Sequence, residues 1–262
     1  MITVFLADQL TWNLPLLFII LVVSGFYIIS QRRNLSFTKK MQPILFLTGV
    51  WLLYGMIGSP LVAFSYLSFS FHMIQMSMVF FIVPPLILLG IPKPVYNKIV
   101  HLPYINRLPH IITPKIALII FAGLFLLYHL PVFLSFVSQF SGLQKIYLTV
   151  LFILSFRMFW PIASPDPNER LLSNRRKKYI WQSSMYIMPA CMLFIISALL
   201  DGMHNPFLNQ IAAHLCLPSG SSIQILPPPF NTKYDQMMAG AIMMGLHKFG
   251  LMVTCKLEKK CC

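Results

Sequence analysis

Side chains of the types that bind soft metal ions accompany three apolar segments of this sequence. His72, Gln75 and Met76 follow one another at helical spacing, so in a helix they share one face. His129 lies inside a second apolar segment, and Asp235 opens a third. Neutral imidazole and thioether suit Cu(I) better than the hard cations Mg²⁺ and Ca²⁺, which prefer oxygen. One interpretation of the pattern is therefore a copper site formed by His72, Met76, His129 and Asp235.

Each of these residues also fits an ordinary role. Methionine fills gaps in apolar helices, so the methionines near His72 also fit plain packing. Asp235 also fits the N-cap of a helix, a frequent position for aspartate. His129 is harder to explain this way, because polar side chains inside a membrane helix are costly and usually face an interior partner. His72 and His129 on neighbouring helices would equally suit the axial ligation of a haem, and this alternative stays open.

The composition predicts the elements that must position these side chains. The chain has 262 residues, of which 57% are hydrophobic and only 10% are charged, whereas a soluble domain has about a quarter charged residues. We expect an all-α polytopic membrane helical bundle, a single integral-membrane domain over residues 1–262. Apolar segments long enough to cross a bilayer predict seven transmembrane helices, at about 14–30, 43–62, 72–90, 116–137, 144–162, 180–200 and 236–254.

The basic residues predict the orientation. Sixteen of the 20 Lys and Arg residues lie in alternate connections and in the C-terminal tail, whereas Lys145 and Lys233 alone lie in the other connections. By the positive-inside rule, the N-terminus is outside and the C-terminus is cytoplasmic. This orientation brings His72 and His129 toward the outer side. The histidines of the outer connection at 201–235, His204 and His214, lie on that side too.

The sequence argues against several classes of function. The six acidic residues lie outside the deep parts of the predicted spans, whereas proton pumps and ion-coupled carriers bury a carboxylate. No P-loop, H-E-x-x-H or G-x-S-x-G motif occurs, so we do not expect an enzyme. The net charge of +14 is concentrated in the connections of a membrane protein, so nucleic acid is not an expected partner. Cys261 and Cys262 follow two lysines, and both lipidation and a disordered tail fit them.

A proline pair interrupts the segment that contains His72. Pro84 and Pro85 lack the N–H group, so carbonyls one turn earlier in the helix lose their partners. In lipid, neighbouring groups must satisfy these carbonyls. We expect a kink here that tilts the His72 end of the helix.

Five stretches together resemble the CtaG family of membrane proteins, which is associated with the assembly of caa3-type cytochrome c oxidase. They are HMIQMSMVFFIVPPLILLGIP (72–92), YHLPVF (128–133), FWPI (159–162), PDP (165–167) and DQMMAGAIMM (235–244). The resemblance covers about residues 45–255, with the stretches in the same order. It implies a multi-pass protein of the bacterial plasma membrane, embedded in the lipid bilayer. It also implies that cytochrome c oxidase subunits of the respiratory chain are its partners.

The resemblance further implies a role in copper delivery and carries four residues over. His72 and Gln75 match an H-x-x-Q element, His129 matches the histidine of the fourth span, and Asp235 matches the acid that opens the last span. Many members have a second histidine after the glutamine, where this chain has Met76, which favours Cu(I) over Cu(II). A metal-free assembly scaffold remains an alternative, since small residues of the last span such as Gly240 permit close helix packing.

Overall fold

The computed structural model describes residues 12–33, 41–100, 112–200, 230 and 232–261. These residues are mainly helical and contain no β-strand. The helices are α2 (Leu14–Arg33), α3 (Met41–Ile57), α4 (Leu61–Leu67), α5 (Phe69–Ser77), α6 (Val83–Gly90), α7 (Lys93–Val100), α9 (Pro114–Tyr128), α10 (Pro131–Gln139), α11 (Ser141–Ala163), α12 (Ser173–Leu200) and α14 (Lys233–Cys261). A π-helical turn, η1 (Met78–Ile82), joins α5 to α6, and a 3₁₀ turn, η2 (Pro167–Glu169), follows α11.

The predicted all-α membrane bundle is confirmed. Among the described residues, five helical segments are long and apolar enough to cross a membrane, and two bent pairs raise this number to as many as seven. The seven segments correspond one to one with the predicted spans. Two of them are bent in a way that the sequence analysis did not anticipate. Helices α3 and α4 meet at 52°, and α9 and α10 meet at 84°.

A proline lies at each of the two bends. Pro60 precedes α4, and Pro131 begins α10. A proline within a helix removes one backbone hydrogen bond and clashes with the preceding turn. The residue before Pro131, Leu130, is accordingly extended, with φ −69° and ψ 130°. The second bend leaves His129 as the residue that caps the C-terminus of α9, at a helix end rather than in a continuous span.

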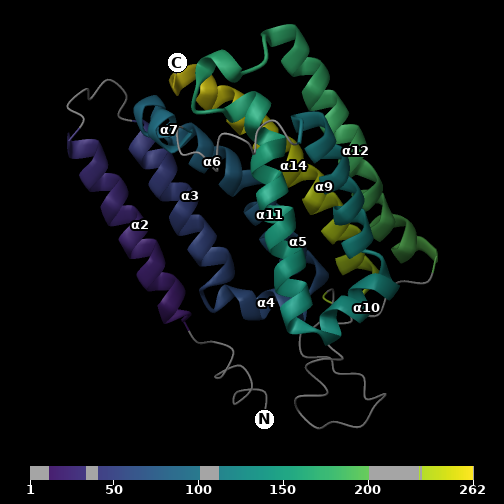
Figure 1. Ribbon diagram of the computed structural model, residues 1–262. Helices are drawn as coiled ribbons and strands as arrows, with labels where there is room; N and C mark the ends of the chain where they lie inside the picture. Colours follow the sequence, from purple (N-terminus) through teal and green to yellow (C-terminus); the bar gives the residue numbers. More distant parts are fainter. Residues whose placement is uncertain (1–11, 34–40, 101–111, 201–229, 231, 262) are drawn as a thin grey trace.

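Helices α5 and α6 form the most buried span of the bundle, whereas Figure 1 shows α2 at its edge. Of the window Phe69–Gly90, 72% is buried, compared with 17% of the window Leu14–Gln31. Helix α2 is held to its neighbours by Tyr27, which donates a hydrogen bond to the Gly90 carbonyl (2.6 Å) and stacks on Phe46 (4.0 Å between ring centroids). Most side chains of the central helix therefore face protein and not lipid.

The proline pair lies in this central helix, immediately after the π turn. Since Pro85 has no N–H, the Phe81 carbonyl one turn earlier has no donor at the usual position. That carbonyl faces α14, where a Cβ on Gly250 would lie only 2.6 Å from the Phe81 oxygen. The absence of a side chain at Gly250 thus lets the backbone of α14 approach this carbonyl. Residues Phe69–Gly90 form one span, and the tilt expected from the proline pair stays a prediction.

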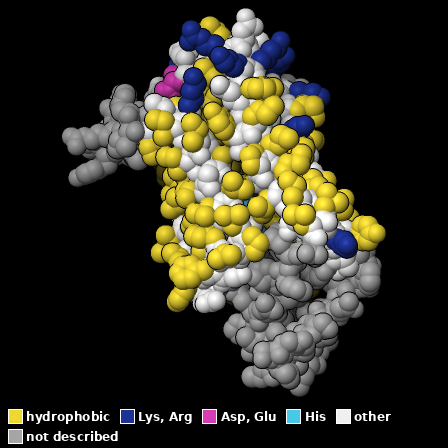
Figure 2. Space-filling view, turned by 90° about the vertical axis from the view of Figure 1, so that its right-hand side faces the viewer, with side chains coloured by type: hydrophobic (Ala, Val, Ile, Leu, Met, Phe, Trp, Pro, Cys, Tyr) yellow, Lys and Arg dark blue, Asp and Glu magenta, His cyan; other side chains and the backbone are white. Residues whose placement is uncertain are grey.

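The two ends of the bundle differ in charge. Figure 2 shows hydrophobic side chains over the middle of one face, and most of its Lys and Arg side chains at the upper end. We call this end the basic end; it contains α7, the first turn of α12 and the last turns of α14 (Figure 1). The short helices α4 and α10 lie at the opposite end, and α5 begins there. The alternation of basic residues is the one that the positive-inside prediction requires.

Candidate metal centre

Helix α5, which carries His72, is held at its first turn by a carboxylate from another helix. Asp235 of α14 accepts hydrogen bonds from the backbone N–H groups of Phe69 (3.0 Å) and Ser70 (3.2 Å). Ser68, the residue before α5, donates its hydroxyl to both carboxylate oxygens, at 2.9 and 3.0 Å. The first N–H groups of a helix have no partner within the helix, and they carry a partial positive charge that favours an anion. Asp235 therefore acts as an N-cap for α5.

The cap role was expected for the helix that contains Asp235, but the structure directs it to a different helix, 166 residues away in sequence. Asp235 is fully buried and its carboxylate is occupied by these donors. Within the described ranges, no three His, Cys, Asp or Glu side chains form a group that could hold a metal ion. Asp235 thus positions the start of α5, the helix that carries His72.

His129 is fully buried at the end of α9. Its Nδ1 atom lies 2.7 Å from the carbonyl oxygen of Phe125. A carbonyl oxygen can only accept a hydrogen bond, so Nδ1 carries the proton and Nε2 carries a lone pair. Nε2 is buried, and no hydrogen-bond partner reaches it from the residues that the structure describes. This is the tautomer in which histidine binds a metal ion, with the second ring nitrogen held by a carbonyl.

The imidazole of His72 faces His129 across the bundle interior. The two ring centroids are 6.4 Å apart, and the planes are inclined by 61°. Tyr128 lies against both rings, at 6.3 Å from His72 and 5.3 Å from His129. Phe194 of α12 approaches His129 from the other side, at 5.4 Å. Two buried imidazoles therefore lie in an aromatic enclosure between α5, α9 and α12.

A cavity of about 200 Å³ adjoins His72. Met76 lines it one helical turn after His72, as the predicted shared face requires. Polar side chains from α11 and α9 also line it, and Gln144 donates a hydrogen bond to the Tyr128 hydroxyl (3.1 Å). Gln75 lines the cavity too, and its amide donates to the Met56 carbonyl (2.6 Å), just before the bend between α3 and α4. Tyr128 belongs to the YHLPVF stretch of the family resemblance, but the sequence assigned it no role, and nothing in the sequence indicated Gln144.

Other methionine and histidine side chains lie away from this site. Met237 and Met238 are 37% and 43% exposed, so they do not join the site. His247 of α14 packs on Phe81 with 4.8 Å between ring centroids. His204 and His214 lie outside the described residues. The side chains of the two C-terminal cysteines likewise lie outside them.

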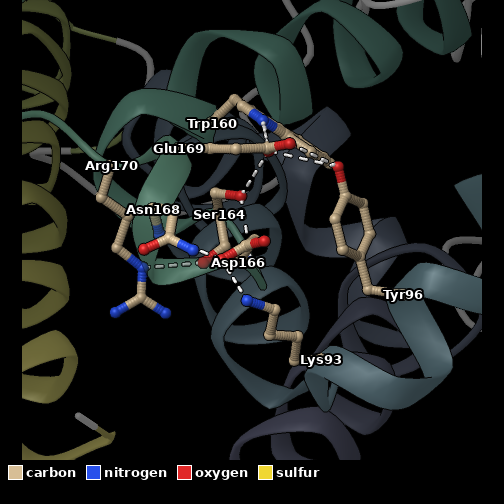
Figure 3. A network of polar contacts seen from close by, with 8 residues as sticks. All are labelled: Lys93, Tyr96, Trp160, Ser164, Asp166, Asn168, Glu169 and Arg170. Atoms are coloured by element: carbon tan, nitrogen blue, oxygen red, sulfur yellow. Dashed lines mark hydrogen bonds and ion pairs between the residues drawn. The ribbon is translucent and has the colours of Figure 1, made fainter.

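A polar network at the basic end was not predicted, although the sequence resemblance included its PDP stretch. Glu169 accepts hydrogen bonds from the Tyr96 hydroxyl (3.0 Å), the Trp160 indole N–H (2.8 Å) and the Ser164 hydroxyl (2.9 Å). Figure 3 shows these side chains converging on Glu169 from α7, α11 and the segment after α11. Burial, and then the hydrogen bond to Glu169, raise the pKa of Tyr96. Glu169 thus ties α7 to the end of α11.

Two ion-pair sets extend this network. Lys93 pairs with Asp166 at 3.0 Å. The pKa of the Asp166 carboxyl is lowered, first by the backbone N–H of Asn168 and then by Lys93. Glu258 of α14 pairs with Arg176 of α12 at 2.6 Å and with Arg170 at 3.7 Å. These contacts hold α7, α12 and α14 together at the basic end.

The comparison with known families decides what kind of protein this is. The family model described as cytochrome c oxidase caa3 assembly factor (Caa3_CtaG) matches residues 23–255, which is most of the chain. The chain belongs to the caa3 assembly factor family. No curated protein and no solved structure matches it.

Membership confirms the family resemblance seen in the sequence. The caa3 assembly factor is a multi-pass protein of the bacterial membrane, and its helices have the length and the lipid-facing apolar surface for this location. Association with a cytochrome c oxidase follows from the family. The buried His72–His129 pair therefore lies inside a protein of a family that serves the assembly of a cytochrome c oxidase.

Proposed function

We propose that this assembly factor binds copper through His72 and His129 and passes it to a caa3-type oxidase. The observation that carries the proposal is the lone pair of His129 Nε2, which is buried without a hydrogen-bond partner among the described residues. Leaving such an atom unsatisfied costs about 1–3 kcal/mol, and most buried polar atoms in proteins avoid this cost. Coordination of a metal ion would satisfy the lone pair.

The separation of the two imidazoles supports the same assignment. Metal–nitrogen bonds of about 2 Å allow the centroids of two imidazoles that share one ion to lie up to about 6 Å apart. The observed 6.4 Å is close to this limit, so one ion would join the two rings in a near-linear arrangement, with a ring nitrogen of each turned toward it. Met76 faces the same cavity as His72 and supplies a soft thioether. A set of imidazole and thioether without thiolate favours Cu(I) and holds it loosely enough for transfer.

Two alternatives make different demands on the site. A haem ligated by both histidines needs a large pocket, whereas the cavity beside His72 has about 200 Å³, below the range of about 300–1,000 Å³ typical of drug-sized ligands. A metal-free scaffold would act through helix packing alone. Helix α14 does pack tightly on α12, because a Cβ added to Gly240 would lie 2.7 Å from the Cys191 carbonyl oxygen.

The test is Cu(I) binding by the purified protein in detergent, measured by competition with bicinchoninate under reducing conditions. We expect one Cu(I) per chain, and a loss of affinity of about 100-fold or more in His72→Gln and in His129→Gln, since even outer-shell changes at metal sites cost about 10–100-fold. Met76→Leu preserves side-chain volume. Packing alone predicts no change in this variant, whereas coordination predicts a loss of about tenfold.

His247→Gln is the matched control, because His247 is also buried in a membrane span and its Nε2 contacts the Ser183 hydroxyl at 3.2 Å. We expect this variant to bind copper as the parent does. Oxidase copper content in cells that express each variant provides the second readout. Unchanged Cu(I) affinity in both His72→Gln and His129→Gln would falsify the site assignment. Full oxidase copper content in those variants would favour the scaffold instead. A Soret band in the purified protein would favour haem.

A further inference from the structure

A groove of about 520 Å³ lies between α12 and α14, on the half of the bundle toward the basic end. Lys177 and Trp181 of α12 line it, and so does Lys248 of α14. Methionine side chains form much of its wall, and Met185, Met188 and Met252 are 46%, 40% and 51% exposed. In a membrane protein such exposed apolar side chains face lipid, so the groove opens to the bilayer.

The groove carries two positive charges that have no acidic partner in the described ranges. The ion pairs there join Lys93 to Asp166, and Arg170 and Arg176 to Glu258. Neither Lys177 nor Lys248 takes part in them. These two lysines are therefore available to an anion from outside the chain.

The depth of the two lysines suits a lipid headgroup. The Ser183 hydroxyl lies 3.2 Å from His247 Nε2, so Lys248 is level with the part of α12 around Ser183. Ser183 lies six residues after Lys177 in α12, so this level is about 9 Å farther from the basic end than Lys177 is. Lysine stems extend along apolar surface while the ammonium reaches the interface, so both ammonium groups can approach one phosphate. Trp181 is 62% exposed between these levels, and exposed tryptophan is typical of the membrane–water boundary.

The methionine wall suits an acyl chain. Methionine is flexible and polarizable, so it adapts to a partner of irregular or changing shape. The alternative occupant of such a sulfur-rich wall is a soft metal. However, no three His, Cys, Asp or Glu side chains gather anywhere in the described ranges, and His247 Nε2 already contacts Ser183.

We propose that the groove binds one anionic phospholipid, with its phosphate between Lys177 and Lys248 and an acyl chain along the methionine wall. Basic pockets between membrane helices commonly bind anionic headgroups on the cytoplasmic side, which is the predicted side of the basic end. The bound lipid joins α12 to α14. It thereby supports the helix pair whose other end carries Phe194 and Asp235, the residues that enclose His129 and cap α5.

The test is native mass spectrometry of the detergent-purified protein, titrated with dioleoylphosphatidylglycerol or with dioleoylphosphatidylcholine. We expect the parent to bind one phosphatidylglycerol about 30-fold more tightly than phosphatidylcholine, which corresponds to about 1 kcal/mol for each lysine. Lys177→Gln with Lys248→Gln should reduce this preference to less than about threefold. Ser184→Phe fills the groove without changing charge, and should weaken phosphatidylglycerol binding while both lysines remain.

The matched control is Lys178→Gln with Lys256→Gln. It removes the same charge from positions of the same two helices that lie outside the groove, and should retain the preference. Equal binding of the two lipids by the parent overturns the proposal. An equal loss of preference in the control also overturns it, because the attraction then comes from general surface charge. Copper binding that survives loss of His72 and His129 but requires Cys191 and His247 would assign the groove to a metal instead.

Discussion

The carboxylate of Asp235 offers the sharpest test of how α5 is positioned. In Asp235→Asn, one carboxylate oxygen becomes an NH₂ group, which cannot accept the backbone N–H of Phe69 or Ser70. One buried N–H then loses its partner, at a cost of about 1–3 kcal/mol. The negative charge at the start of α5 is also lost, at about 0.3–1 kcal/mol or somewhat more for a buried site. We therefore expect Asp235→Asn to destabilise the protein by about 1–4 kcal/mol.

The assay is equilibrium unfolding in mixed micelles of dodecyl maltoside and dodecyl sulfate, followed by circular dichroism, with Cu(I) affinity measured in parallel. A cap that positions α5 predicts a large loss of stability and a smaller, secondary loss of copper affinity. A metal ligand predicts the reverse. The cap assignment is refuted if Asp235→Asn unfolds within about 0.5 kcal/mol of the parent. The same substitution at the partly exposed Asp166 is the control, and at neutral pH we expect it to destabilise by less than about 1 kcal/mol, as is usual for an ion pair near the surface.

Two further predictions concern packing and pH. Gly250→Ala places a Cβ 2.6 Å from the Phe81 carbonyl oxygen and should destabilise by about 1–3 kcal/mol. Gly245→Ala in the same helix meets no atom within 4 Å and should be neutral or stabilising by up to about 1 kcal/mol; equal thermal unfolding of the two variants would contradict this account. The pKa of Asp166 is lowered in the folded state, first by the hydrogen bond from the Asn168 N–H and then by Lys93. These contacts therefore stabilise the fold above the unfolded pKa, and their contribution is lost as pH falls through the folded pKa. Asp166→Asn should therefore flatten the dependence of the unfolding temperature on pH below about 4, and an unchanged slope would contradict the assignment.

The number and order of the membrane segments could be predicted because the bilayer imposes a length and an apolar composition on every span. That constraint acts within each segment and needs no tertiary information. The bends were missed for the opposite reason. Pro131 was visible, but a proline in a membrane helix can be accommodated in several ways, and here the chain turns by 84°. That turn is what leaves His129 at a helix end with its Nδ1 on the Phe125 carbonyl.

The candidate site could be predicted in part. The shared face of His72 and Met76 follows from helical spacing alone, and both line the same cavity. The pairing of His72 with His129 depends on how α5 packs near α9, which the sequence left as a hypothesis. The hydrogen-bond partners of the Asp235 carboxylate were not predictable, because Ser68, Phe69 and Ser70 belong to a segment far away in the sequence.

For this protein the sequence determined what is local or compositional: a helical membrane bundle, the approximate ends of its spans, the alternation of basic connections and the helix face that carries His72 and Met76. Tertiary structure decided which buried polar atoms meet. In the folded structure the Asp235 carboxylate caps the start of α5, and Glu169 accepts hydrogen bonds from Tyr96 and Trp160. Packing also leaves the His129 Nε2 lone pair without a hydrogen-bond donor among the described residues. The physical reason is that burying a polar group is costly unless a partner is present, and the partners come from distant segments that only packing brings together.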